Sequence, residues 1–314
     1  MHLQHTHLTP WRVGIVSKTF FNVPLWAGIS MGWFAQEGLD VETVLMGNAS
    51  QVEPLLSGSL QVVLGTPEAT LQNAAKGGPL RIVAGNTGKL SHSLITRAPF
   101  KTVTSLKGGK LGILNKVEGS FFQLKAMLAH HGLHYPADYE VVEMGGVPPR
   151  HKALLEGTID GGLQSIPWNY VAEEAGMNNL GEITGYVPDW QFVSVNADMS
   201  KFRADPSQLE AFIRVLLRAT EWLHQHKTEA SMVAEKELPT TSEYAQRAWD
   251  YYTETNALTR DMSVNRKGLE VVIQTQIDAG LIPKEAPTSV DFYLAPECII
   301  KARAQSGADA EGNH

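Results

Sequence analysis

Residues 105–128, SLKGGKLGILNKVEGSFFQLKAML, join a short apolar run to a longer segment with helical spacing. The run KLGIL at 110–114 predicts a buried strand, and the apolar residues after Gly119 recur at the intervals of an amphipathic helix. Glu118-Gly119-Ser120 lies between them. The first N–H groups of a helix that begins there have no partner inside the helix and lie at the positive end of its dipole. We therefore expect this turn to cap the helix, to bind an anion, or to do both.

The same alternation of strands and helices extends in both directions. Strands are predicted at 12–17, 40–46, 62–65, 80–85 and 92–97 before this stretch, and at 140–144 and 159–164 after it. A helix at 23–37, ended by Gly38, is one of those between them. From Ser207 onward, the periodic segments are all helical. This order is typical of an α/β protein with parallel or mixed sheets and a helical C-terminal segment.

The alternation restarts near Lys101, and this restart predicts two lobes. We expect residues 11–95 and 197–304 to form lobe one, and residues 96–196 to form lobe two. Residues 1–10, which include His2, His5 and His7, and residues 305–314 are expected to be flexible.

Composition narrows the class of partner. The chain has 314 residues, 43% of them hydrophobic, a net charge of −7 and no basic cluster, so a nucleic-acid partner is disfavoured and a small molecule is favoured. No run reaches the about 20 apolar residues of a membrane span. No secretory leader is visible, which indicates a cytoplasmic protein if Met1 is the native start and a periplasmic one if the sequence is a processed form. The single cysteine, Cys298, is expected to be a small buried hydrophobe.

Several segments together resemble a known family. In order and spacing over about residues 11–200, the chain is similar to the SsuA, TauA and NMT1/THI5-like substrate-binding proteins; the matching segments are WFAQEGLDVETV (33–44), LLSGSLQVVLGTPEA (55–69), SLKGGKLGIL (105–114), EGSFFQLKAML (118–128) and ALLEGTIDGGLQSIPW (153–168). The resemblance implies the type II periplasmic-binding-protein fold. In that fold, two α/β lobes are joined by hinge strands and close on a ligand in the cleft between them. An ABC transporter permease is the protein partner that it implies.

Ligand residues are expected in the turns that follow the strands, because ligands of open α/β sheets bind beyond the carboxyl ends of strands. Ser120 is the strongest candidate, since the resemblance implies that a serine hydroxyl and free N–H groups face an acidic ligand group at this place. The neighbouring Glu118 would repel such a group unless a cation such as Lys116 intervenes. The aromatic candidates favour an aromatic or heterocyclic ligand over a strongly charged one. The complete predicted set is Phe20, Phe21, Asn22, Asn48, Ser50, Thr66, Asn86, Thr87, Glu118, Gly119, Ser120, Gly146, Gln164, Trp168 and Trp190.

Two classes of function remain open. The first is a solute-binding protein of an ABC-type uptake system, or a ligand sensor, and it is not an enzyme. The second is an intracellular enzyme on the same fold, a decarboxylase or other lyase or hydrolase, with His92 as the acid or base. The pyrimidine synthase and aryl sulfinate desulfinase relatives of the fold are expected to use cysteines that Cys298 cannot supply. No metal site or cofactor is expected, because no metal-ligand spacing or nucleotide motif occurs.

Overall fold

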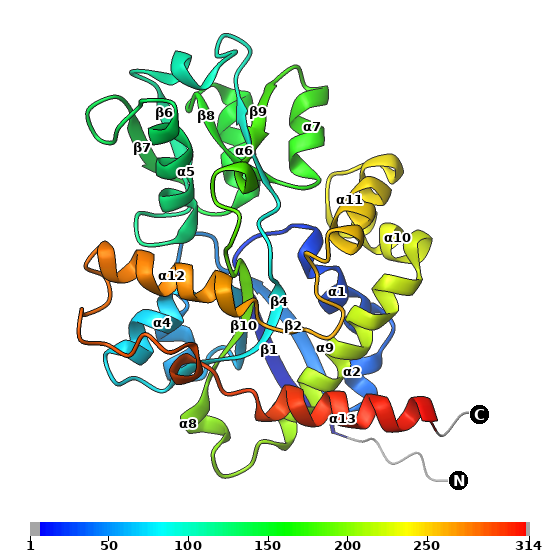
Figure 1. The fold of residues 1–314 in the computed structure, drawn as a ribbon. Helices are drawn as coiled ribbons and strands as arrows, with labels where there is room; N and C mark the ends of the chain where they lie inside the picture. The colour runs from blue at the N-terminus through cyan, green and yellow to red at the C-terminus, as the bar shows by residue number, and fades with distance from the viewer. Residues whose placement is uncertain (1–6, 312–314) are drawn as a thin grey trace.

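The computed structural model describes residues 7–311 and places them in two lobes, each built on a five-stranded sheet. In Figure 1 the lobe with β6 to β9 and α5 to α7 lies above the lobe with β1, β2, β4 and β10. The expectation of a two-lobed α/β fold with a helical C-terminal segment is confirmed. Within the described residues, no helix is both long and apolar enough to cross a membrane.

The sheet of lobe one has the order β2-β1-β3-β10-β4. β1 runs parallel to β2 and β3, whereas β10 lies between β3 and β4 and is antiparallel to both. Its strands are β1 (Thr9–Ile15), β2 (Leu39–Leu45), β3 (Val62–Gly65), β4 (Leu80–Thr87) and β10 (Val193–Asp198).

Helices from both ends of the chain cover this sheet. They are η1 (Phe20–Asn22), α1 (Val23–Ser30), α2 (Trp33–Gln36), α3 (Val52–Ser57), α4 (Glu68–Ala75), α8 (Met199–Phe202), α9 (Ser207–Gln225), α10 (Lys227–Glu237), α11 (Ser242–Glu254), α12 (Arg266–Asp278), η4 (Val290–Tyr293) and α13 (Glu297–Glu311). The single helix predicted at 23–37 is wrong. It breaks before Trp33 because Gly32 has a φ of 69°, in the left-handed region that interrupts an α-helix.

The sheet of lobe two has the order β7-β6-β8-β5-β9. β6 is parallel to β7 and β8, and β5 is antiparallel to β8 and β9. Its strands are β5 (His92–Thr96), β6 (Lys110–Ile113), β7 (Glu140–Glu143), β8 (Gly161–Ser165) and β9 (Asn178–Glu182), and its helices are η2 (Val103–Leu106), α5 (Gly119–His130), α6 (Val147–Glu156), α7 (Trp168–Glu174) and η3 (Ile183–Gly185).

The chain passes between the lobes twice, at 88–91 and 186–192 (Figure 1). The expected boundaries at 95/96 and 196/197 fall inside β5 and β10. Strand pairing places all of β5 in lobe two and all of β10 in lobe one, so the crossings lie a few residues earlier than expected. Thr9 pairs with Leu39, and α13 continues to Glu311, so ordered elements enter both ranges expected to be flexible. His2 and His5 lie outside the described residues.

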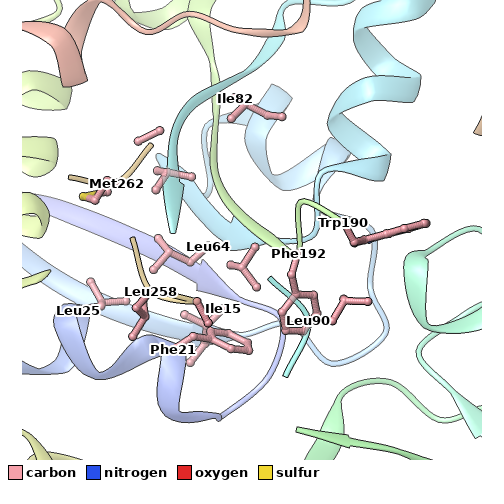
Figure 2. Close-up of a cluster of buried hydrophobic side chains, with 14 of the residues drawn as sticks. Ile15, Phe21, Leu25, Leu64, Ile82, Leu90, Trp190, Phe192, Leu258 and Met262 are labelled. Atoms are coloured by element: carbon pink, nitrogen blue, oxygen red, sulfur yellow. The ribbon is translucent and has the colours of Figure 1, made fainter. Parts of the chain in front are cut away.

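A continuous apolar core connects lobe one to the crossing segments. Figure 2 shows Phe21 close to Ile15 of β1, with Leu90 and Phe192 of the two crossings beside them. Burial of side chains of this size stabilises the fold by about 1.5–3 kcal/mol each. Cys298 is 3% exposed, as predicted, and burial raises the pKa of its thiol to about 11. This core fixes the ends of the crossings next to the space between the lobes.

Candidate functional site

A cavity of about 40 Å³ lies between the two lobes. This volume is enough for about three water molecules. Lobe one and the second crossing contribute Val16, Ser17, Phe21, Thr66, Phe192 and Val193, and lobe two contributes His92, Leu114, Gly119, Ser120, Gln123, Gly146, Val147, Arg150 and Ser165. The lining comes from the turns after β1 and β3 on one side and from the ends of β5, β6 and β8 and the starts of α5 and α6 on the other. The site is therefore complete only when the lobes meet.

Ser120 lines the cavity but does not cap its helix. α5 begins at Gly119 with Glu118 as the N-cap residue, and the Ser120 hydroxyl accepts a 2.9 Å hydrogen bond from the backbone N–H of Leu114. The expectation of a Ser120 cap is wrong because the serine lies two residues after the N-cap position, inside the helix. Its side chain instead ties the start of α5 to the end of β6. The hydroxyl proton has no acceptor among residues 7–311 and can be donated into the cavity.

Arg150, on the second turn of α6, is a buried cation in the cavity wall. Its side chain is 2% exposed, and the Nε and Nη1 groups have no hydrogen-bond partner in the described chain. The aliphatic stem fits over Gly112 of β6 and Gly162 of β8, which pair in register; a Cβ at Gly112 would lie 3.4 Å from the Arg150 Cγ. Burial lowers the Arg150 pKa to about 10, so the guanidinium remains charged at neutral pH. Such a charge is costly to bury without a counter-ion.

His92 begins β5 and faces the same cavity. Its ring meets the Phe192 ring edge-on, with ring centroids 4.6 Å apart. Burial, and then the charge of Arg150, lower the His92 pKa to about 3, so the imidazole is neutral at pH 7. Its Nδ1 atom has no hydrogen-bond partner within residues 7–311. His92 is therefore a weak candidate for proton transfer, because no described carboxylate orients it.

Two more buried polar groups in the wall lack partners. They are Gln123 Oε1 and Ser165 Oγ, neither of which is hydrogen-bonded to any described residue. Buried polar groups in native proteins are nearly always hydrogen-bonded, so several such groups around one cavity indicate a place for a polar ligand. Most of the remaining wall is apolar and includes Phe21 and Phe192, whose ring planes cross at 86° with centroids 5.6 Å apart.

Two glutamates from opposite lobes meet beside the cavity. Glu68 is 0% exposed at the start of α4, and Glu118 precedes α5 and accepts a hydrogen bond from Thr66 Oγ1 of lobe one. Burial, and then the charge of Glu118, raise the Glu68 pKa well above its ordinary value; burial also raises the Glu118 pKa. Glu68, whose carboxyl oxygens have no hydrogen-bond partner among residues 7–311, therefore keeps its proton to a higher pH than an exposed glutamate. Gly119 leaves room for the two carboxyl groups, since a Cβ there would lie 2.8 Å from Glu68 Oε1.

Other contacts also join the lobes around the cavity. Trp168 Nε1 donates to the Lys18 carbonyl at 2.9 Å, and the Val147 N–H donates to Ser17 Oγ at 3.0 Å. On α12, Gln276 Nε2 donates to the Val117 carbonyl at 3.1 Å. These bonds connect lobe one to the starts of α6 and α7 and to the turn before α5. The structure thus describes lobes in contact, with the cavity between them.

The structure brings six of the predicted residues to the cavity, and these are Phe21, Thr66, Gly119, Ser120, Gly146 and His92. The remaining predicted residues do not line it. Phe20 stacks on Tyr252, Asn22 donates to the Ser17 carbonyl, and Thr87 donates to Asn86. Glu118 lies beside Glu68, and Asn48 and Ser50 are exposed to solvent. The other three, Gln164, Trp168 and Trp190, are buried near the cavity.

The sequence reasoning missed Ser17, Gln123, Arg150, Ser165 and Phe192. Arg150 lies in PPRHKALLEG, where three consecutive basic residues resemble the solvated face of a helix. The signal that could have found it is the glycine in each of two buried strands, Gly112 and Gly162, because glycines there make room for a long side chain above the sheet.

A family model described as NMT1/THI5 like matches residues 21–230. The chain is 23% identical over 300 residues to YtlA of Bacillus subtilis, whose provisional name is that of a binding protein; the match covers 90% of this chain and 87% of YtlA. It is 25% identical over 240 residues to the 4-amino-5-hydroxymethyl-2-methylpyrimidine phosphate synthase of Candida albicans, covering 67% of this chain and 66% of the synthase.

Solved structures with this fold include the ligand-binding component of an ABC-type import system of Staphylococcus aureus, solved with zinc bound. It superimposes with a TM-score of 0.74 at 14% identity, covering 94% of this chain and 99% of the other. At this identity the likeness shows the shared fold. Residues 7–311 contain no group of three or more metal-binding side chains.

Proposed function

Because the chain belongs to the NMT1/THI5-like family, we propose that it is a solute-binding protein that encloses a small organic molecule between its two lobes. The observation that carries the proposal is the interlobe cavity, whose wall combines apolar side chains with buried polar groups that lack partners in the described chain. Ligand sites are concave, mostly apolar, and contain a few polar groups that fix the orientation of the ligand. YtlA and the S. aureus import component support binding over catalysis.

Binding in this cavity requires the lobes to separate and then close. A volume of about 40 Å³, closed by contacts on several sides, admits a molecule only after those contacts break. Hinge motion about two crossing segments is a common mode of closure around a ligand. We propose the segments 88–91 and 186–192 as the hinge.

We propose uptake as the biological role, with an ABC transporter permease as the protein partner. The import component of S. aureus supports this assignment through its shared fold. An uptake role corresponds to a periplasmic location, and the alternative of an intracellular enzyme corresponds to a cytoplasmic one. The enzyme alternative has less support, because His92 has a pKa of about 3 and lacks a carboxylate partner within residues 7–311.

A disulfide between the lobes tests the proposal directly. Gly145 of lobe two faces Asn48 of lobe one, and a Cβ at Gly145 would lie 3.5 Å from the Asn48 Cβ, within the range of disulfides. In the double variant Asn48→Cys, Gly145→Cys, the oxidised protein should neither take up nor release ligand, and reduction should restore both. The two single variants control for the strain of a cysteine at the positive φ of Gly145.

The readout is native mass spectrometry of the protein with a compound library, together with solution scattering. The reduced protein should bind a library compound and contract when it does. If the oxidised and reduced proteins exchange the same ligand at equal rates, binding does not pass through opening of the lobes, and the proposal fails.

A further inference from the structure

The charge of Arg150 has no counterpart in the described chain. Arg150 is 2% exposed, and none of the ion pairs among residues 7–311 includes it. Buried arginines are normally paired with a carboxylate or another anion, because an isolated charge loses its hydration without compensation. Burial lowers its pKa, the direction expected for a guanidinium that has no carboxylate beside it.

The neighbouring acids do not compensate the charge. Burial, and then the charge of Glu118, raise the Glu68 pKa well above its ordinary value, and Glu118, whose pKa burial also raises, accepts the hydrogen bond from Thr66. His92 is neutral and cannot supply negative charge. No group among residues 7–311 compensates the guanidinium, so we infer that a bound molecule does so when the lobes close.

We propose that the ligand is an organic acid whose carboxylate binds the Arg150 guanidinium; this inference rests on the proposed function of the cavity. A guanidinium presents parallel N–H donors that match the two oxygens of a carboxylate. The Nε and Nη1 groups lie on different sides of the guanidinium and face no protein acceptor in the described residues, so each side has a free N–H for a ligand oxygen. The Ser120 hydroxyl and Ser165 hydroxyl, in the same wall, are further donors for the oxygens.

The rest of the cavity wall indicates the shape and polarity of the part of the ligand that is not the carboxylate. Phe21 and Phe192 present aromatic surfaces at right angles, and Val16, Val147 and Val193 complete an apolar side. Gln123 Oε1 is available as a single acceptor for a ligand donor. The wall thus favours a small, flat or apolar acid. This inference agrees with the aromatic ligand predicted from the sequence, but it differs from that prediction in giving the ligand a negative charge.

Matched pairs of an acid and its amide test the inference, because the two members differ mainly in charge. The probes are benzoate with benzamide and acetate with acetamide, and benzenesulfonate and inorganic phosphate distinguish a carboxylate from other oxyanions. Binding is measured by calorimetry and by the midpoint of thermal unfolding in a buffer of bulky, weakly binding anions. We expect the acids to bind and the amides to bind roughly 100-fold more weakly.

Variants of two basic residues on the same helix distinguish direct binding by Arg150 from a general effect of positive charge on acid binding. Arg150→Met keeps most of the side-chain volume and removes the charge, and Lys152→Met removes an exposed charge two residues away. The Lys152 variant should bind acids like the wild type, whereas the Arg150 variant should lose the preference for acids. Without ligand, Arg150→Met should unfold at the same temperature as the wild type or higher, because it removes an uncompensated buried charge. Arg150→Lys should retain part of the acid binding through its charge.

The outcomes distinguish this inference from the proposed function. If an amide or another neutral compound binds as tightly as its acid, or if Arg150→Met binds acids like the wild type, the carboxylate assignment is overturned while binding between the lobes stands. A clear loss of stability in ligand-free Arg150→Met also overturns the carboxylate assignment, because such a loss would show that the guanidinium already has a partner inside the protein. This measurement does not depend on which probes bind. The disulfide-locked protein tests the cavity itself without reference to charge.

Discussion

Glu68→Gln should remove a proton-dependent component from the stability of the protein. In the folded state the carboxyl group is fully buried, and its pKa is raised well above the ordinary 4.5 by burial and by Glu118. In the unfolded chain the same group titrates near its ordinary value. The folded protein therefore holds a proton that the unfolded chain releases above pH 4.5. Because the folded pKa is the higher one, the stabilisation is complete below the unfolded pKa and is lost as pH rises through the folded pKa.

The size of the effect follows from one proton. In the window between the two pKa values, the free energy of unfolding falls by about 1.4 kcal/mol per pH unit. Between pH 5 and pH 6, where the unfolded carboxyl is mostly ionised, the wild type should lose about 1 kcal/mol through Glu68. Glutamine keeps the shape and cannot titrate, so the variant should lose correspondingly less. Burial also raises the pKa of Glu221, and the comparison of the two proteins cancels its contribution.

Urea unfolding at steps of half a pH unit from pH 4.5 to pH 8 measures the free energy of unfolding against pH for the wild type and for Glu68→Gln. Glu156→Gln, an exposed glutamate on α6, is the matched control and should follow the wild type. The stability difference between Glu68→Gln and the wild type should grow with pH across the window and then level off. Parallel curves from pH 5 to pH 8 would show that Glu68 does not keep its proton in the folded protein, and the reasoning would be refuted.

Three further predictions concern single side chains. Ser120→Ala should lower the free energy of unfolding by about 1–3 kcal/mol in urea titrations, because the buried N–H of Leu114 loses its acceptor; an unchanged stability would contradict the role of that bond. Trp168→Phe removes the bond to the Lys18 carbonyl and should weaken closure by about 1 kcal/mol, seen as a roughly five-fold faster ligand release in stopped-flow. Cys298, with its pKa of about 11, should react slowly with a thiol reagent at pH 8 in the native protein and rapidly in urea; equal rates would show that the thiol is accessible.

The fold was largely predictable because its elements are encoded by local patterns. The runs at 62–65 and 110–114 are short and apolar, and the helices after them have a regular apolar period, so both their type and order could be inferred. The lobe crossings were less predictable. β5 and β10 join their sheets by pairing with strands far away in the sequence, and no local pattern shows which sheet a strand will join.

The site was predictable only where it consists of turns. Thr66, Gly119 and Gly146 were found because they follow strands, and the ends of neighbouring strands meet at the same edge of a sheet. Arg150 could not be found this way, because its burial depends on the packing of α6 over two glycines from β6 and β8. Phe192 was missed because it belongs to the second crossing, whose position depends on both lobes at once.

The position of β10 in the middle of the first sheet has a consequence for synthesis. The five strands of lobe two form one uninterrupted stretch, His92 to Glu182, whereas the first sheet has a gap between β3 and β4 until residues 193–198 exist. Domains fold as units while the chain is made, usually in order from the N-terminus. Here that order is inverted, since the inserted lobe has all its strands first. The earlier strands β1 to β4 must wait on the ribosome, with two open edges, for a strand made about a hundred residues later.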